Sequence, residues 1–346
     1  MKKAVALSLA VAMVIGMVTG CGSADGQNQN AETENSTDVV ETENAQEGAE
    51  ASGDADGSGE TYKIGVIQLT EHAALDAANE GFVAALDAAG INYTIDQQNA
   101  QNDQSACQTI AEKLVNDGND LILAIATPAA QAVAGATEEI PVLVTAVTDP
   151  ADAGLVASNE APGNNISGTS DLTPVKEQIE LLTKLLPEAK KVGILYCSAA
   201  SNSEFQADLA TAACTEAGLE TEIFTVSSSN EIQQVVESMV GKVDVLYAPT
   251  DNTIAAGMAT VTMVANDNGL PTICGEEGMV DAGGLATYGI NYYEIGYMAG
   301  EMAVDILVNG ADVSTMPIGY LSADKCTLKT NQETADMLNI DLSVLD

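Results

Sequence analysis

The chain has 346 residues, more than one hydrophobic core usually organises, so its length predicts two lobes or domains. It carries 51 acidic residues against 11 lysines and no arginine, which gives a formal net charge of -40. The electrostatic field of such a negative charge repels polyanions. Without arginine, the guanidinium group that usually binds phosphate or guanine is also missing, so nucleic acid is excluded as a partner. His72 is the only histidine, so we expect no imidazole-based metal site and predict no cofactor.

Residues 1–20 have the features of a signal peptide. Lys2 and Lys3 precede an apolar run over residues 4–17, and residues 18–21 read Val-Thr-Gly-Cys. A run too short to span a bilayer comfortably, followed by small residues and a cysteine, resembles a bacterial lipoprotein signal. The resemblance implies cleavage before Cys21, acylation of its thiol with a lipid such as palmitate, and anchoring at the extracytoplasmic face of the cell membrane. An ordinary secretory signal with a chance cysteine is the alternative.

Residues 21–61 are predicted to be a disordered tether. Residues 22–61 contain eleven acids, no lysine, and no Leu, Ile or aromatic residue. A segment of this composition cannot bury enough apolar surface to offset its chain entropy. We therefore expect a flexible link between the lipidated Cys21 and a folded body that begins near residue 62.

From residue 62 onward, short apolar runs alternate with longer amphipathic ones, which is typical of parallel β/α units. The first half contains predicted strands at residues 63–68, 92–97, 120–125 and 141–145, and predicted helices at residues 72–89, 104–117 and 129–137. The alternation restarts after residues 165–168. The second half contains predicted strands at residues 191–196, 221–226, 243–248, 272–274 and 284–289, and predicted helices at residues 174–186, 203–217, 231–240, 252–268, 293–309 and 331–338. The pattern predicts an α/β protein with two Rossmann-like lobes and parallel sheets.

The ends of these predicted strands are the places to look for a site, because ligands of open parallel sheets collect outside the carboxyl ends of the strands. Hydroxyls, amides and acids follow the strands, at Gln68, Thr127, Ser170, Asp171, Thr250, Asp251, Asn252 and Glu277. Any of them could instead cap a helix, as Asp171 could for the helix near residue 174. Capping does not explain why two acids lie beside hydroxyl residues on one rim, so the set is predicted to bind a ligand.

A resemblance to a known family rests on a combination of motifs. They are residues 64–68 (IGVIQ) with His72 and residues 75–76, residues 126–128 (ATP), 147–150 (VTDP), 165–171 (NISGTSD), 248–252 (APTDN) and 283–286 (GGLA). Together they resemble the tryptophan/tyrosine-binding group of ABC-transporter substrate-binding proteins, which have the type I periplasmic-binding-protein fold. The resemblance covers residues 62–346.

The resemblance implies two lobes joined by three crossings, near Ser167, Tyr288 and Pro317. Lobe 1 would then comprise residues 62–167 and 290–317, and lobe 2 residues 168–289 and 318–346. It also implies that a monomeric protein traps a small solute between its lobes by hinge closure and hands it to ABC permease subunits.

The implied solute is an aromatic amino acid, with tyrosine, phenylalanine and tryptophan ranked together. Without arginine, backbone N–H groups and hydroxyls would hold its carboxylate, at Thr127, Pro128, Ala129 and Ser203. Asp171 and Asp251 would face its ammonium group. The candidates for an apolar slot around the ring are His72, Leu75, Phe205 and Tyr288. An aromatic content of 3% argues against sugars, whose sites use ring stacking, but leaves a branched-chain amino acid or a nucleoside open.

Two rival classes of protein compete with a transport protein. An enzyme is not expected, because no G-x-S-x-G or P-loop motif is present, and a Cys/His pair would need His72 with Cys197 or Cys274, which close apolar strands. A receptor that presents its ligand to a membrane sensor is not separated from a transporter by the sequence. The cysteines after Cys21 are odd in number and lack C-x-x-C spacing, so they are predicted to be mostly free and buried.

Overall fold

The computed structural model describes residues 60–322 and 325–345, all of which belong to one compact unit. The predicted signal peptide, Cys21 and the tether as far as residue 59 lie outside the described residues. Thr61, which the composition assigns to the tether, is the first residue of strand β1. Among the described residues no helix is both long enough and apolar enough to cross a membrane.

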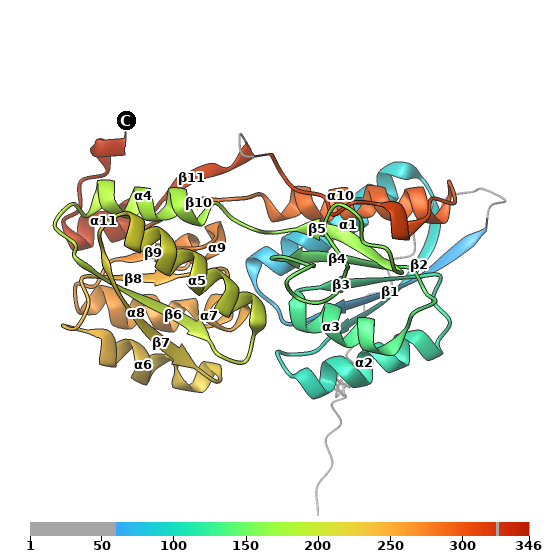
Figure 1. Cartoon of the computed structure of the whole chain (residues 1–346), viewed down its shortest axis with the longest axis horizontal. Coiled ribbons are helices and arrows are strands. Elements are labelled where there is room, and N and C mark those ends of the chain that lie inside the picture. The colour runs from blue at the N-terminus through green and yellow to red at the C-terminus, as the bar shows by residue number, and fades with distance from the viewer. Residues whose placement is uncertain (1–59, 323–324, 346) are drawn as a thin grey trace, which may run out of the picture. The chain divides into compact units, whose positions relative to one another are not determined.

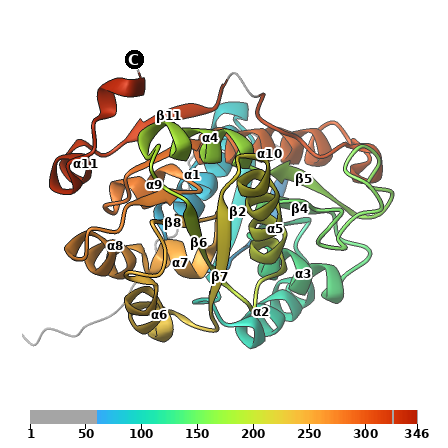
Figure 2. The ribbon, with the colours of Figure 1, turned by 60° about the vertical axis from the view of Figure 1, so that its left-hand side comes forward.

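The first sheet has five parallel strands in the order β2-β1-β3-β4-β5. The strands are β1 (Thr61–Gln68), β2 (Asn92–Asn99), β3 (Leu121–Ile125), β4 (Val142–Val147) and β5 (Ile166–Ser170), and the helices between them are α1 (Ala73–Ala89), α2 (Gln104–Asn116) and α3 (Thr127–Ala136). Helix α10 (Tyr292–Leu307) returns from the second half of the sequence and packs along α1 (Figures 1 and 2). We call this sheet with α1, α2, α3 and α10 lobe 1.

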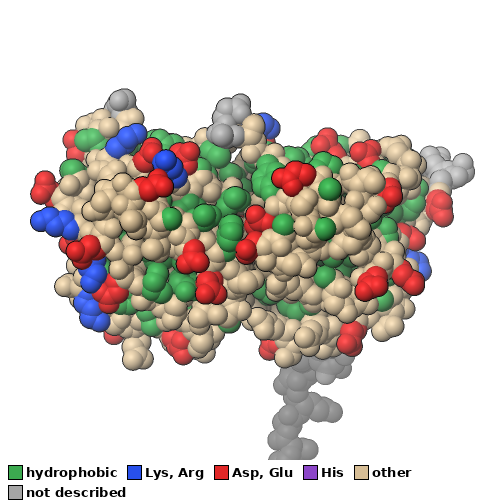
Figure 3. All heavy atoms as spheres, viewed as in Figure 1, with side chains coloured by type: hydrophobic (Ala, Val, Ile, Leu, Met, Phe, Trp, Pro, Cys, Tyr) green, Lys and Arg blue, Asp and Glu red, His purple; other side chains and the backbone are tan. Residues whose placement is uncertain are grey.

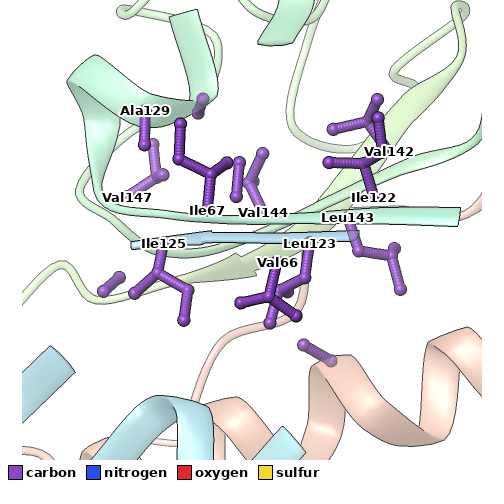
Figure 4. Close-up of a cluster of buried hydrophobic side chains, with 14 of the residues drawn as sticks. Val66, Ile67, Ile122, Leu123, Ile125, Ala129, Val142, Leu143, Val144 and Val147 are labelled. Carbon is purple, nitrogen blue, oxygen red and sulfur yellow. The ribbon is translucent and has the colours of Figure 1, made fainter. Parts of the chain in front are cut away.

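The core of lobe 1 lies on both faces of its sheet. Figure 4 shows Val66 and Leu123 pointing to the side of the sheet that α1 and α10 cover, whereas Ile67 and Ile122 point to the opposite side, where Ala129 of α3 lies. All five side chains are 0% exposed. Burial on both faces explains why these strands appear in the sequence as continuous apolar runs rather than as an alternation.

The second sheet has six strands in the order β11-β10-β9-β8-β6-β7, of which only β11 is antiparallel to its neighbour. The strands are β6 (Lys191–Cys197), β7 (Glu220–Val226), β8 (Val245–Ala248), β9 (Thr272–Cys274), β10 (Ala286–Gly289) and β11 (Thr327–Thr330). The helices are α4 (Val175–Leu185), α5 (Ser201–Glu216), α6 (Ile232–Met239), α7 (Asn252–Ala256), α8 (Met258–Asp267), α9 (Glu277–Asp281) and α11 (Gln332–Leu338). We call this sheet with its helices lobe 2; short 3-10 helices occur at Ser229–Glu231, Val313–Thr315 and Leu342–Leu345.

The order from β7 to β10 repeats the order from β2 to β5, because each sheet places its first strand between its second and third. The connections that leave β1 and β3 therefore run in opposite directions along the sheet, and so do the connections that leave β6 and β8. Such a switch point is where ligands bind in this class of sheet. The predicted fold class, an α/β protein with two parallel-dominated sheets, is confirmed.

Some elements differ from the sequence-based expectation. The predicted helix at residues 252–268 is interrupted at Gly257, where the backbone approaches Ile232 so closely that a Cβ would lie 2.3 Å from its Cδ1. Strands β5 and β11 and helix α9 were not predicted. The residues of β11 are almost all exposed and show no apolar pattern, and α9 has only five residues, so neither produces a periodic signal.

The connections between the lobes also differ in detail. Strand β5 stays paired with β4 as far as Ser170, so the chain remains in lobe 1 beyond the predicted crossing at Ser167. Gly319 forms an isolated bridge with Thr169, so the last passage to lobe 2 follows Gly319 rather than Pro317. The remaining lobe limits stay a prediction.

Charge is distributed unevenly between the lobes. Only two lysines of the folded body, Lys63 and Lys113, belong to lobe 1 elements or to their connections. Figure 3 shows acidic side chains spread over one face of the molecule, with most of the lysines on that face gathered over lobe 2, at the left of the view. Neither lysine of lobe 1 lies among the residues that line the cavity described next.

Candidate ligand-binding site

A small cavity lies where residues that follow the strands of both lobes come together. Its lining residues are His72, Leu75, Asp171, Thr250, Asp251, Asn252, Ala255, Glu276 and Tyr292. Its volume is about 10 Å³, roughly the room that one water molecule needs. Ligand pockets usually measure about 300–1,000 Å³, so in this form the cavity is far smaller than a ligand pocket.

Asp171 follows β5 directly and is fully buried in the cavity wall. Its Oδ2 accepts a hydrogen bond of 2.8 Å from the hydroxyl of Tyr292, whereas its Oδ1 has no partner at hydrogen-bonding geometry. Burial raises the pKa of Asp171 to about 6, although hydrogen bonding by Tyr292 and by the nearby Thr148 acts in the opposite direction. Helix α4 begins after Pro174 without a side-chain cap, so Asp171 does not cap it. Capping is therefore no explanation for this carboxyl group.

Asp251 follows β8 and has a local structural role in addition to its place in the cavity. Its carboxylate accepts backbone N–H groups of Cys197 at 2.6 Å and Ile254 at 2.8 Å, and the second bond caps α7. Ser203 adds a side-chain hydrogen bond, while burial raises the pKa of Asp251. The hydroxyl of Ser203 is thus engaged by Asp251, whereas the sequence-based expectation assigns it to a ligand carboxylate.

Glu276 completes the set of buried carboxyls, and the sequence pattern did not predict it. It caps α9 by accepting the N–H groups of Gly278 at 2.5 Å and Met279 at 2.9 Å, and burial raises its pKa to about 7. The predicted Glu277 is partly exposed and instead accepts a hydrogen bond from Thr327 at the edge of lobe 2. Glu276 stands directly before a short helix, as Asp251 does, and this position in the sequence could have identified it.

Tyr292 is a second lining residue that the sequence pattern did not predict. It is the first residue of α10 and its hydroxyl is engaged with Asp171, whereas the predicted Tyr288 lies within β10 and is not among the lining residues. The carbonyl of Tyr288 accepts a hydrogen bond of 2.7 Å from Gln178 inside lobe 2. The predicted Phe205 is half-buried on α5 and does not line the cavity either.

His72 and Leu75 lie in the cavity wall, as predicted for a ring-binding slot. His72 Nε2 is 3.1 Å from Asn252 Oδ1, a hydrogen bond that joins lobe 1 to lobe 2. Its Nδ1 is buried and has no partner. Burial lowers the pKa of His72, outweighing the hydrogen bond to Asn252 and the nearby Asp76 and Asp251, and so favours the neutral ring.

The residues predicted to bind the ligand carboxylate, Thr127, Pro128 and Ala129, lie at the start of α3, beside a groove that is separate from the cavity. Ala126, which precedes the helix, has φ of 81°, a strained value for a residue with a side chain. The Thr127 hydroxyl is buried without a partner, and no side chain caps the helix. Pro128 lines a groove of about 300 Å³ that Asn252 also borders. Ala129 is buried, so only its N–H remains available to a ligand.

Two other predicted residues support the site from outside the cavity wall. The Gln68 amide donates to Asp76 Oδ1 at 2.6 Å, and the Ser170 hydroxyl donates to the Thr148 carbonyl at 2.7 Å. Gln206, which was not predicted, is fully buried and donates to Thr148 Oγ1 of lobe 1 at 3.0 Å and to Thr250 of lobe 2. It therefore links the lobes next to the cavity.

The electrostatic character of the cavity is that of a cation site. Asp171, Asp251 and Glu276 share its wall, and none of its lining residues is a lysine. Within residues 60–322 and 325–345 no group of three His, Cys, Asp or Glu side chains is arranged to hold a metal ion. The arrangement instead suits a small organic cation that brings its own hydrogen-bond donors.

The cysteines show the environment of structural thiols. Cys107, Cys197, Cys214 and Cys274 are buried and form no disulfide. Burial raises the pKa of the Cys274 thiol well above its usual value, whereas a catalytic cysteine needs the opposite change. The ring nitrogen of His72 that has a partner bonds to Asn252 rather than to a thiol.

Comparison with known proteins supplies the context for this geometry. Residues 63–344 match the family of ABC transporter substrate binding proteins. A tyrosine-binding protein of Clostridioides difficile (strain R20291) is 41% identical over 343 residues, which cover 98% of this chain and 93% of the relative.

Two solved structures are also similar. The structure of an ABC domain in complex with L-Trp, from Streptococcus pneumonia, is 38% identical, covers 83% of this chain and 98% of its own, and has a TM-score of 0.79. The ligand-free, open structure of a substrate binding protein with adhesive properties, from Clostridium difficile, is 45% identical, covers 81% of this chain and 95% of its own, and has a TM-score of 0.63.

Proposed function

The chain belongs to the family of ABC transporter substrate-binding proteins, and from this premise we propose that it captures a free aromatic amino acid outside the cytoplasm for an ABC importer. One observation carries the proposal: Asp171 presents a buried, unpartnered carboxylate oxygen to a cavity that Asp251 also lines and that contains no lysine. An ammonium group carries a positive charge and three donors, so it supplies what these carboxylates lack. The tyrosine-binding relative and the L-Trp complex support an aromatic side chain.

The carboxylate of the amino acid would lie at the start of α3. The unpartnered Thr127 hydroxyl and the uncapped N–H groups of the first helical turn are donors, and a helix N-terminus favours a negative charge. Pro128 and Asn252 border the groove between this helix and the cavity. A zwitterion would thus place its two charges against groups of opposite character in one cleft.

Capture would proceed by hinge closure. The 45% identical open structure superposes with a TM-score of only 0.63, whereas the 38% identical L-Trp complex reaches 0.79. A structure with higher sequence identity would normally superpose better. Here the structure with the higher identity has the lower TM-score, which supports a rearrangement of the two lobes between open and closed forms. Interlobe hydrogen bonds would hold the closed form; they run from Asn102 to Thr253, from Gln104 to the Ala199 carbonyl, between His72 and Asn252, and from Gln206 to Thr148.

A thermal-shift screen of the purified protein tests the ligand. The panel contains all amino acids, several nucleosides and several sugars, because a ligand at about 100 times its dissociation constant adds roughly 2.7 kcal/mol to stability. We expect the aromatic amino acids to raise the melting temperature and Asp171→Asn to abolish the increase. Stabilisation by a nucleoside, a sugar or a branched-chain amino acid alone would overturn the ligand. Mass spectrometry of the denatured protein shows beforehand whether a ligand has co-purified.

The membrane anchor is a separate part of the proposal. Cys21 follows a lipobox-like sequence and lies outside the described residues, so its lipidation is inferred from the sequence alone. Cys21→Ala should release the protein from the membrane fraction, whereas Ser23→Ala should leave it bound. Retention of Cys21→Ala in the membrane would contradict the anchor without affecting the ligand proposal. Uptake of labelled ligand by cells lacking the protein separates an importer subunit from a receptor that serves a sensor, because only the importer loses transport.

A further inference from the structure

Gln206 joins the two lobes with a single side-chain amide. It lies on α5 of lobe 2 and is 0% exposed, although it does not line the cavity. Its Nε2 donates to Thr148 Oγ1 of lobe 1 at 3.0 Å, and to the carbonyl of Thr250 of lobe 2 at 3.2 Å as well as to the Thr250 hydroxyl. Its Oε1 accepts the N–H group of Thr250 at 3.4 Å. Both polar atoms of this buried side chain are therefore engaged.

In lobe 1, the partner of Gln206 is tied to Asp171. Thr148 follows β4 directly, and its carbonyl accepts the Ser170 hydroxyl at 2.7 Å. The Ser170 oxygen in turn accepts the N–H group of Leu172 at 3.1 Å, so Thr148 is connected to both neighbours of Asp171. The Thr148 hydroxyl also lowers the pKa of Asp171, which means that it lies close to this carboxyl group.

In lobe 2, the connection to the second acid is direct. Thr250 precedes Asp251 in the chain, and both residues line the cavity. The Asp251 carboxylate is held in place by the backbone N–H group of Cys197 at 2.6 Å. The position of Thr250 relative to Thr148 therefore influences how far Asp251 lies from Asp171.

The bond from Gln206 to Thr148 differs in burial from other bonds between the lobes. The interlobe bond of Asn102 is partly buried and that of Gln104 is exposed, so water can replace their partners. The bond from Gln206 to Thr148 is buried. Removing one partner of a buried bond leaves the other unsatisfied, which costs more than an average hydrogen bond contributes.

We infer that Gln206 is a positioning residue for ligand binding: its amide holds Thr148 to Thr250 in the closed form and thereby sets the spacing of Asp171 and Asp251 around the ligand ammonium. The inference rests on the proposed function, which places an ammonium group between these two acids. In an open form the bond to Thr148 would be absent, whereas the bonds to Thr250 stay within lobe 2. Gln206 therefore acts on the release of the ligand rather than on its entry.

Stopped-flow fluorescence with L-tryptophan tests the inference on the whole protein. The chain contains no tryptophan, so the fluorescence of this ligand is not masked. Gln206→Met keeps roughly the length of the side chain and removes the amide. We expect release to become about fivefold to a hundredfold faster with association almost unchanged, because the unpaired Thr148 hydroxyl weakens the closed form alone. An unchanged release rate would overturn the inference.

Gln178→Met is the matched control. Gln178 is also 0% exposed, and its amide donates to the carbonyls of Gly275 at 3.0 Å and Tyr288 at 2.7 Å, both in lobe 2. This variant should lose stability in thermal unfolding, as Gln206→Met does, and yet release L-tryptophan at the unsubstituted rate. Equal acceleration in the two variants would show that Gln206 supports only the packing of lobe 2, which would overturn its positioning role.

A double-mutant cycle assigns the effect to the bond between the lobes. Thr148→Val removes the hydroxyl and should also speed release, whereas Thr148→Ser keeps the hydroxyl and should release slowly. The double variant with Gln206→Met should release far more slowly than the product of the two fold-changes predicts, because both partners of the bond are then apolar. Fold-changes that multiply would contradict the inference. If Gln206→Met does not fold, equal release rates in Thr148→Val and Thr148→Ser would do the same.

The outcome for the proposed function can be read separately. Titration calorimetry of the unsubstituted protein with L-tryptophan, L-tyrosine and L-phenylalanine shows whether an aromatic amino acid binds at all. If none binds, the proposed function fails, and with it the inference. If they bind and Gln206→Met releases them at the unsubstituted rate, the proposed function stands and only the role of Gln206 fails.

Discussion

Two interfaces in this protein bring together segments that lie far apart in the sequence, and they are built in opposite ways. In the contact between α1 and α10, which we call the glycine seam, Gly81, Gly296 and Gly300 let the helix backbones meet, and a Cβ at Gly296 would lie 1.8 Å from the Ala78 carbonyl oxygen. In the cavity between the lobes, the wall is mostly polar, and two buried atoms of its lining residues have no partner.

The contrast separates the source of stability from the source of binding. The glycine seam joins fully buried residues such as Phe82 and Ala299 and leaves no room for adjustment. Asp171 Oδ1 and His72 Nδ1 belong to residues of the cavity wall and are unpaired, which costs free energy that the proposed ligand would relieve by providing the missing partners. Substitutions in the two places should therefore have opposite signatures.

The largest effect is expected from Asp171→Asn in the cavity. The change leaves the ligand ammonium without one of its charged partners in a desolvated site, so affinity should fall by roughly 3–5 kcal/mol, while the unliganded protein should be as stable or more stable. Calorimetry and thermal unfolding at pH 7.5 measure the two quantities. The exposed acids Glu138 and Glu139 provide matched controls, as Glu→Gln variants. Equal, small losses in all three would contradict the cation site.

The second prediction concerns pH. The folded-state pKa of Asp171 is raised from 3.8 to about 6 and that of Glu276 from 4.5 to about 7, so the folded protein binds more protons than the unfolded chain between these values. The contribution of these two groups to stability without ligand should therefore be largest below about pH 4. It should fall as pH rises to about 7, by about 3 kcal/mol for Asp171 alone. Affinity should rise over the same range, because only the ionised carboxyl pairs with an ammonium.

Comparison with Asp171→Asn isolates this effect. His72, whose pKa is lowered by burial, and the surface carboxyls contribute equally to both proteins and cancel in the difference. Denaturant unfolding from pH 4 to pH 8 supplies the curves. Parallel curves for the two proteins would show that Asp171 does not titrate in this range.

The third prediction tests the glycine seam. Gly296→Ala forces a methyl group against the backbone of α1, so the free energy of unfolding should fall by about 1–3 kcal/mol or more. Gly135→Ala is the control, because Gly135 lies in α3 with no atom within 4 Å of the added Cβ; it should stabilise by about 0.4–1 kcal/mol. Ligand affinity of the folded Gly296→Ala protein should change little. Equal stability of the two variants would mean that the helices can separate at no cost.

The smallest effect is expected from Asn102→Gly. Asn102 of lobe 1 donates to Thr253 Oγ1 of lobe 2 at 2.9 Å, and its φ of 62° suits glycine, so the change removes the side-chain bond without straining the backbone. Loss of about 0.5–1.5 kcal/mol should appear as faster ligand release in stopped-flow experiments. Gln101→Gly, with φ of 51° in the same turn, is the control. Identical release rates for the two variants would show that this bond does not hold the lobes closed.

The amino-acid pattern was enough to predict the β/α alternation and several of the positions that line the cavity. Strands buried on both faces must be apolar throughout, so β1, β3 and β4 are visible as short apolar runs. Since parallel strands carry ligand residues at their carboxyl ends, His72, Asp171 and Asp251 are identified from their place in the chain. The absence of arginine also favours a helix start for the carboxylate of the proposed ligand, because no guanidinium group can bind it.

What each of these groups does depends on the assembled fold. Asp171 and Asp251 look alike in the sequence, yet one caps no helix and has a free oxygen, whereas the other caps α7 and binds the backbone of β6. Glu276 rather than Glu277 lines the cavity, although the two are adjacent. The physical reason is that burial and hydrogen-bond partners depend on segments far apart in the chain, and local patterns carry no information about which residues those segments bring into contact.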